Sequence, residues 1–346
     1  MQLDIDIVRF LSAQFAERSE MALVGPLQQE RGISRQAAAA MLSRLVHRGY
    51  LHPGSGQRPK TYTLSTLAHL DETFPLAGLE EHVIWAQYAK PYLVDYVTSE
   101  SLGIWEYGIT EMINNAIDHS QGTTLRVQLF VNAAYGSCLI TDDGEGIFRR
   151  ITRLCKLPDE RQAILELAKG KLTTDPGNHS GEGIFFSSRA FDSYGIFSGG
   201  LVFDHVHDGP DLLLEHGYED AKTQGTTVYM RHGNACPRAL REVFDQFAEP
   251  DEYTFSKTIV PVRLAKMGAE SLLSRSQAQR LLARIERFKT VILDFDGVET
   301  IGQAFADEIF RVFQRNHPDV ELLTRSTNDQ IQNMIRRARA HDDSQG

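Results

Sequence analysis

The sequence lacks the long apolar segments of a membrane protein and has few cysteines. No uninterrupted apolar run approaches the roughly 20 residues that a membrane-spanning helix needs. Near the N-terminus, Asp4 and Asp6 interrupt the basic-then-apolar pattern that marks a secretion signal. Cys138, Cys155 and Cys236 are scattered without a C-x-x-C pair, so neither a disulfide framework nor a zinc site is indicated. We therefore expect a cytoplasmic protein with no membrane partner.

Negative charge predominates, but not at the N-terminus. The formal net charge of −10 argues against general affinity for nucleic acid. Residues 1–64 nevertheless contain eight Lys or Arg and five acids, a net charge of +3, which leaves −13 for the remainder. Between Arg31 and Leu64 there is no acidic residue. This asymmetry indicates a basic module attached to an acidic body.

Residues 1–66 contain a helix that is well delimited by its ends. Ser34 is suited to cap a helix from Arg35 to about Arg48, and Gly49 is a natural stop. Earlier apolar residues share one face of another helix. After the capped helix we expect a strand, a flexible basic loop over Pro53–Lys60 and a second strand.

This order of elements resembles a winged helix-turn-helix. The resemblance implies a recognition helix in the major groove of double-stranded DNA and a wing that contacts phosphates. The residues left facing outward as candidate DNA contacts are Arg35, Gln36, Arg44, His47, Arg48, Arg58 and Lys60. A winged helix used only for protein contacts or dimerisation is the alternative, and the acid-free stretch favours DNA.

The central segment, residues 79–247, contains a helix with an unusual polar face. Glu111, Asn115 and Asp118 lie at i, i+4 and i+7, hence on one side of that helix. A carboxylate and a carboxamide one turn apart can hold an attacking water and coordinate Mg²⁺ through oxygen. Such a pair alone is weak evidence, because polar helix faces often contain one.

Further motifs follow in a recognisable order. A strand ending at Thr141 runs into the D-D-G-E-G-I stretch of residues 142–147, G-E-G at Gly181–Gly183 opens a helix, and Gly225-Thr226 begins a strand. With the Glu-x-x-x-Asn helix, this order resembles the nucleotide-binding boxes of the GHKL superfamily of gyrases, histidine kinases and chaperone ATPases. The resemblance extends from that helix to the Gly225-Thr226 strand. It implies that ATP and Mg²⁺ bind to a Bergerat-type α/β sandwich.

The resemblance also implies a role for each box. Asp142 would accept the adenine amino hydrogen, and Asn115 would bind Mg²⁺. Glycines would permit a close turn under the base and a close approach of amides to phosphate. The residues implied for ATP are Asn115, Asp118, Asp142, Gly144, Gly146, Ile147, Lys171, His179, Ser180, Gly181, Gly183, Ile184 and Thr226.

The segment Leu167–Ser180 would form a mobile lid over the nucleotide. Lys169 and Lys171 are candidate phosphate contacts there, although a loop rich in Lys and Thr is more often simply solvated. Glu111 stands where hydrolytic members and serine kinases of the superfamily carry a general base. The position therefore points away from histidine autophosphorylation, and we interpret the upstream His82 as structural.

Residues 253–340 alternate strands and helices, which predicts a small α/β domain. Residues 293–298, L-D-F-D-G-V, followed by a helix from Gly302, resemble the strand-loop-helix of STAS domains. Anti-anti-sigma members carry a phosphorylatable serine at the start of that helix, whereas Gly302–Phe305 has no hydroxyl. Ser274 is interpreted as the cap of an earlier helix.

Taken together, the fold class is α/β and α+β multidomain, with a winged helix (1–66), a GHKL domain (79–247) and a STAS-like domain (253–340), joined at Ser65–Gly78 and Ala248–Tyr253. This organisation predicts a transcriptional regulator switched by ATP-dependent ordering of the lid, with slow hydrolysis through Glu111. An anti-sigma-type serine/threonine kinase and a nucleotide sensor without chemistry are the alternatives. A protein partner at the STAS-like domain and a homodimer are further possibilities.

Overall fold

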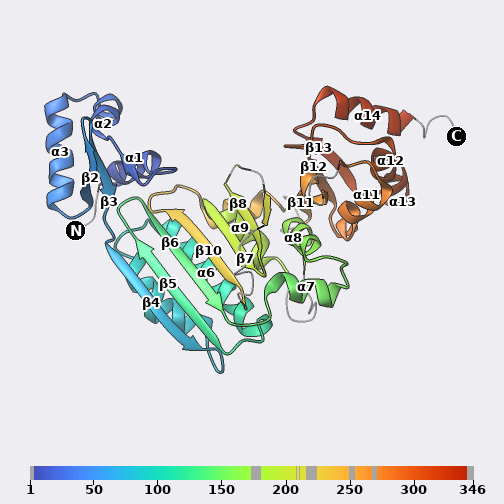
Figure 1. Cartoon of the computed structure of the whole chain (residues 1–346), viewed down its shortest axis with the longest axis horizontal. Helices are drawn as coiled ribbons and strands as arrows, with labels where there is room; N and C mark the ends of the chain where they lie inside the picture. The colour runs from blue at the N-terminus through green and yellow to red at the C-terminus, as the bar shows by residue number, and fades with distance from the viewer. Residues whose placement is uncertain are drawn as a thin grey trace. The chain divides into compact units, whose positions relative to one another are not determined.

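The computed structural model of the chain combines helices with both antiparallel and parallel sheets (Figure 1). It describes residues 4–172, 181–207, 209, 211–215, 224–248, 254–266 and 271–340. Two compact units are present: Met1–Gly144 with Ala190–Tyr194 and Thr226–Leu240, and Glu145–Arg189 with Gly195–Gly225 and Arg241–Gly346. Among the helices of the described ranges, none has the length and apolar character needed to cross a bilayer. The mixed α/β multidomain class predicted from the sequence is confirmed.

The first unit begins with a small helical module and a short antiparallel sheet. Its elements are α1 (Ile5–Gln14), β1 (Glu20–Met21), α2 (Val24–Arg31), α3 (Arg35–His47), β2 (Leu51–Gln57) and β3 (Lys60–Leu64), with strand order β1-β3-β2. The capped helix is confirmed: α3 begins at Arg35, and the Ser34 hydroxyl accepts a hydrogen bond from the backbone N–H of Ala37. Phe10, Leu11 and Leu42 lie in the core of this module.

The predicted flexible loop over Pro53–Lys60 is wrong in its extent. Strand β2 continues to Gln57 and pairs with β3 at Lys60. The physical reason is the Glu20 carboxylate, which accepts hydrogen bonds from the backbone N–H of Ser55 at 2.7 Å and of Gly56 at 3.1 Å. Hydrogen bonds from Thr61 and Ser55 lower the pKa of Glu20 to about 2. A side chain from β1 thus orders a stretch whose composition alone indicates a loop.

An antiparallel sheet forms the larger part of the first unit. In it the strands run in the order β4 (Ala68–Pro75), β5 (Thr124–Val131), β6 (Tyr135–Asp142) and β10 (Thr227–Gly233). Strand β4 occupies the predicted linker Ser65–Gly78, so that stretch belongs to the sheet. Its charged residues Asp71 and Glu72 are exposed, and Asp71 forms a paired hydrogen bond with Arg126 at 2.7–2.8 Å.

Helices cover one face of this sheet (Figure 1). After the short α4 (Glu81–Val83), the π-helix η1 (Ile84–Ala89) and α5 (Lys90–Leu93), the long α6 runs from Ser99 to His119. Trp105 of α6 is fully buried, and Gly136 of β6 leaves space for its indole, since a Cβ there would lie 2.9 Å from Cζ2. The strand β7 (Ser193–Ser198) begins in this unit with Ser193 and Tyr194.

The second unit contains α7 (Ile147–Cys155), α8 (Glu160–Lys169) and α9 (Gly183–Ala190), followed by the strands β7, β8 (Leu201–Val206) and β9 (Leu212–Glu215) in that spatial order. The helix α10 (Leu240–Asp245) comes next. Within the predicted joint Ala248–Tyr253, residues 249–253 lie outside the described ranges.

The C-terminal part of the second unit is a parallel sheet, as strand–helix alternation predicts. The order is β11 (Lys257–Pro261), β12 (Thr290–Asp294), β13 (Glu321–Arg325). The helical elements around it are η2 (Val262–Ala265), α11 (Arg275–Leu282), η3 (Ile285–Arg287), α12 (Gln303–Asp307), η4 (Glu308–Phe313), α13 (Gln314–Asn316) and α14 (Asp329–Ala340) (Figure 1). The predicted cap is confirmed, because Ser274 and Gln277 form a capping box at the start of α11.

Candidate functional site

The helix α6 presents the predicted polar residues on one face. Glu111 and Asn115 are half-buried and Asp118 is exposed, whereas Met112 and Ile113 are fully buried against the sheet. The side-chain amide nitrogen of Asn115 is buried and hydrogen-bonds no other residue in the described part of the chain. An unsatisfied buried amide costs about 1–3 kcal/mol. A buried side-chain nitrogen without a partner among the described residues, as in Asn115, is therefore unusual.

Asp142 lies at the end of β6 and is buried among backbone N–H groups. Its Oδ1 accepts hydrogen bonds from Gly144 N at 2.9 Å and from Thr226 N at 3.3 Å, and its own N–H donates to the Thr226 carbonyl at 3.0 Å. Burial raises the pKa of the Asp142 carboxyl above its ordinary value. The structure thus brings three predicted nucleotide residues, Asp142, Gly144 and Thr226, into one hydrogen-bonded group.

The neighbouring carboxylate, Asp143, has the opposite environment. It accepts hydrogen bonds from Thr124 N at 2.9 Å and from Thr123, through N at 2.6 Å and Oγ1 at 2.7 Å. The backbone N–H of Thr124 and the Thr123 hydroxyl hold the pKa of Asp143 well below its ordinary value. Asp143 is therefore occupied in tying the loop to the start of β5, and Asp142 remains the candidate for recognition.

Gly144 is required by a close approach of two segments. A Cβ at this position would lie 2.6 Å from the carbonyl carbon of Ser120, at the end of α6. The turn after Asp142 can therefore pass directly beside the C-terminal end of the helix that carries Asn115. This contact fixes the position of the turn after Asp142 relative to the end of α6, within the first unit.

The remaining nucleotide residues belong to the second unit. Gly146, with φ of +88°, precedes α7, which begins at Ile147, and a Cβ there would lie 2.6 Å from Ser198 Oγ. Gly183 and Ile184 begin α9, and Gly181 precedes it with φ of +72°. Of the predicted lid, residues 173–180, which include His179 and Ser180, lie outside the described ranges. Their roles stay predictions.

The two lid lysines contact the C-terminal part of the same unit. Lys169 Nζ donates to Glu166 Oε1 at 2.7 Å and to the carbonyls of Arg280 and Ala283 at 3.0 and 2.9 Å. Lys171 Nζ donates to the Arg287 carbonyl at 3.2 Å. The ammonium groups predicted for phosphate are thus engaged by the end of α11 and the segment that follows it.

A cavity of about 470 Å³ lies elsewhere in the second unit. Arg189, His205, Asp211, Asp294 and Arg325 are among the residues that line it. Arg189 forms a paired hydrogen bond with Asp211 at 2.7–2.8 Å, and Arg325 donates to Asp294 at 2.7 Å. These charged groups are therefore paired with one another across short distances.

The predicted DNA contacts are all on the surface. Arg35, Gln36, Arg44, His47 and Arg48 are on α3 or at its end, and Arg58 and Lys60 are at the tight turn that joins β2 to β3 (Figure 1). Gln36 and Arg44 are exposed on α3, and Arg48 is exposed at its C-cap.

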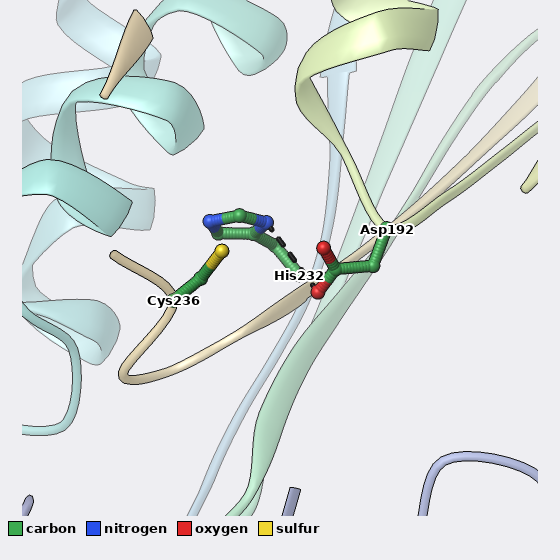
Figure 2. A group of neighbouring side chains, drawn as sticks. All are labelled: Asp192, His232 and Cys236. Atoms are coloured by element: carbon green, nitrogen blue, oxygen red, sulfur yellow. Dashed lines mark ion pairs between the residues drawn. The ribbon is translucent and has the colours of Figure 1, made fainter. Parts of the chain in front are cut away.

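One group of reactive side chains was not predicted. Asp192, His232 and Cys236 lie together in the first unit, although Asp192 is far from the other two in sequence (Figure 2). The H-x-x-x-C spacing of His232 and Cys236 was the available signal. It is a weak one, because paired cysteines are the usual mark of a metal site in a sequence.

Comparison with known families identifies one part of the chain. Residues 277–332 match a family described as a STAS-like domain of unknown function (DUF4325). No curated protein matches the chain. The matched range runs from α11 to the first turn of α14 and includes β12 and β13. The C-terminal part of this protein is therefore a STAS-like domain.

Proposed function

We propose that this chain is an ATP-binding, DNA-binding transcriptional regulator with a STAS-like output domain. The observation that carries the proposal is the buried Asp142 carboxylate, fixed by Gly144 N and Thr226 N at the end of β6. A buried carboxylate held by backbone amides is a preorganised acceptor for an exocyclic amine such as that of adenine. An antiparallel sheet backed by α6 is also what a Bergerat-type domain requires.

Asn115 fits the proposed Mg²⁺ site. A flip of its amide exchanges nitrogen and oxygen, so the buried position that lacks a partner among the described residues can present the carbonyl oxygen that Mg²⁺ prefers. When bound, Mg²⁺ would neutralise phosphate charge. Glu111, one turn earlier on α6, would hold and polarise a water for slow hydrolysis.

The proposed DNA-binding end is the N-terminal module. Its order α1, β1, α2, α3, β2, β3 resembles that of a winged helix and supports the proposal, and α3 with the β2–β3 turn carries the basic side chains. No acid occurs between Arg31 and Leu64 to weaken attraction to phosphate.

The proposed output runs through the STAS-like domain. Lys169 and Lys171 connect the start of the predicted lid to residues 280–287 of that domain. A nucleotide that draws the lid toward phosphate would compete with these contacts. The lid would therefore report the nucleotide state to the surface of the STAS-like domain.

A serine/threonine kinase of the anti-sigma type is the second candidate, because the chain carries a STAS-like domain and Glu111. Phosphorylation of its own α12 start is disfavoured, since residues 302–305 carry no hydroxyl. A Cβ at Gly302 would also lie 2.8 Å from the Leu273 Cα. A serine does not fit there without a backbone shift. Incubation with γ-labelled ATP and lysate would reveal transfer to another protein.

The ATP proposal is tested by exchanging the two adjacent aspartates separately. Asp142→Asn keeps one acceptor oxygen for Gly144 and Thr226 but replaces the other with an amide NH2 group, a donor that cannot accept from the adenine amino group. ATP affinity, measured by calorimetry, should fall at least about tenfold. Asp143→Asn should leave it within about twofold, because Asp143 faces Thr123 and Thr124. Equal ATP affinity in the parent and both variants would refute the proposal.

A further inference from the structure

Asp192, His232 and Cys236 form a compact group of metal-binding side chains in the first unit (Figure 2). Asp192 immediately precedes β7, His232 lies in β10, and Cys236 lies in the turn that follows β10. One potential ligand atom from each residue lies within 4.8 Å of the others. Thiolate, imidazole and carboxylate are the three ligand types that Zn²⁺ takes from proteins.

His232 is the side chain that requires an explanation. It is 0% exposed, and among the described residues neither ring nitrogen has a hydrogen-bond partner. A buried imidazole without a hydrogen bond is costly, and native structures seldom retain one without a ligand or a functional reason. The ring packs edge-on against Phe191, with centroids 5.8 Å apart.

The distance between His232 and Asp192 can be compared with that of a hydrogen bond and with that of two ligands on one metal ion. Nδ1 lies 3.6 Å from Asp192 Oδ2, which is longer than the roughly 2.7–3.2 Å of a hydrogen bond. Two nitrogen or oxygen ligands at about 2.0–2.1 Å from a tetrahedral Zn²⁺ lie about 3.4 Å apart. The ion pair between these two residues therefore also has the spacing of two ligands on a shared ion.

Asp192 is held in place by groups outside the cluster. Its Oδ2 accepts from Gly233 N at 2.7 Å, and its Oδ1 accepts from Arg238 Nη2 at 2.9 Å. Outer partners of this kind orient a metal-binding carboxylate and keep it ionised. Burial raises the pKa of Asp192, but the nearby imidazole, the Gly233 amide and the Arg238 charge outweigh it and leave the pKa below its ordinary value.

Cys236 supplies the sulfur ligand of the group, and it is more exposed to solvent than His232. It is half-buried in the turn after β10, where its N–H donates to the Gly233 carbonyl at 3.3 Å. Figure 2 shows its sulfur directed toward the imidazole of His232. A thiolate selects Zn²⁺ over Mg²⁺ or Ca²⁺, which prefer all-oxygen sites. The Cys236 sulfur lies within 4.8 Å of the other two ligand atoms, and zinc binding would draw the three atoms closer together.

We propose that Asp192, His232 and Cys236 bind a Zn²⁺ ion, with the fourth position open to solvent. The ion would fasten the start of β7 to β10 and to the Gly233–Cys236 turn. That turn contacts the N-terminal module, because Arg9 Nε donates to the Ala235 carbonyl at 3.4 Å. The site is separate from Asp142 and Asn115, so it stands or falls independently of ATP binding.

The test uses the full-length chain, stripped of metal by a chelator and kept reduced with a non-thiol reductant. Co²⁺ is titrated as a coloured substitute for Zn²⁺, followed by competition with Zn²⁺. We expect saturation at a single ion per chain, with visible bands of a tetrahedral ion and an ultraviolet thiolate charge-transfer band. Cys236→Ser should remove the thiolate band and weaken binding at least about tenfold, and His232→Gln should weaken binding similarly.

Cys155→Ser is the matched control, because Cys155 is a half-buried thiol in the second unit. Burial raises the pKa of the remaining thiol, Cys138, to about 12, so it does not compete near neutral pH. Zn²⁺ should raise the thermal midpoint of the parent and of Cys155→Ser, but not that of Cys236→Ser. Absence of saturable binding in the parent, or a thiolate band that survives Cys236→Ser, would overturn the proposal even if the His232 variant fails to fold.

Discussion

Lys169 is the buried charge on which the stability of the second unit should depend most. Its side chain is 2% exposed and that of Glu166 is 6% exposed, with Nζ and Oε1 separated by 2.7 Å. The carbonyls of Arg280 and Ala283 accept the other two ammonium hydrogens. Breaking a buried pair by removing one partner costs about 3–5 kcal/mol. Because Glu166 keeps Arg284 at 3.2 Å, the lower end is expected for Lys169→Met, about 3 kcal/mol.

Urea unfolding followed by circular dichroism measures this loss as a lower midpoint. Lys90→Met, at an exposed position of α5, is the control and should change stability by less than about 0.5 kcal/mol. The double variant Glu166→Leu/Lys169→Met should be less destabilised than the sum of the single variants, by about 1–3 kcal/mol. A loss below about 1 kcal/mol in Lys169→Met, or strict additivity, would show that the buried Glu166–Lys169 pair does not stabilise the second unit.

Acid stability, ATP hydrolysis and DNA binding should each respond to a different replacement. Burial raises the pKa of Asp211, but the charge of Arg189 and nearby hydrogen bonds hold it below its ordinary value. The unfolded state therefore takes up the proton first, and stability present above about pH 4 is lost as the pH falls. Asp211→Asn should flatten the decline of the thermal midpoint between about pH 5 and 3, and an unchanged slope would contradict this. Glu111→Gln should lower phosphate release at least about a hundredfold while ATP affinity persists, whereas unchanged release would exclude it as the base. Arg44→Ala/Arg58→Ala should weaken binding to DNA from upstream of the coding sequence and reduce the salt slope by about two, as shift assays at several salt concentrations would show.

Local signals in the sequence were sufficient to predict helices whose first residues are capped by a neighbouring side chain. Ser34 and Ser274 were predicted as caps, and each accepts a hydrogen bond from the third helical residue. The alternation of strands and helices in residues 253–340 was also predicted, from the change of pattern along the sequence. Capping and periodicity depend on residues within a few positions of one another.

Elements fixed by distant partners were not predictable in the same way. Strand β4 is charged and polar on its exposed face, and it is a strand because it pairs with β5, which follows only after α4, α5 and α6 in the sequence. The Gly and Ser residues of β2 are ordered by Glu20, which lies in a separate, earlier strand. Composition alone indicates a linker and a loop at these places. The partners that order these segments, β5 and Glu20, can be identified only from the folded structure.

The candidate site residues also differ in whether a local motif could predict their contacts. Asp142, Gly144 and Thr226 were found because each lies in a short motif, and the fold brings these three together. Lys169 was assigned to phosphate from its place near a Gly-rich loop. Its contacts with residues 280–283 depend on a segment in another part of the sequence, which no local pattern could indicate.

Two strands of the first unit connect its candidate sites to the N-terminal module. In β6 and β10, Thr141 pairs with Thr227 beside Asp142, and Tyr135 pairs with Gly233 at the opposite end, about 20 Å away. At that far end, Arg231 of β10 donates to the carbonyls of Phe15 and Ala16, both at 3.0 Å, where the chain leaves α1. The two strands therefore form a continuous hydrogen-bonded connection between the Asp142 end and the residues that follow α1. The proposed zinc site stands at the same far end as Arg231. An ion there would stiffen the attachment of the N-terminal module, and its loss would weaken the transmission of any signal from the Asp142 end.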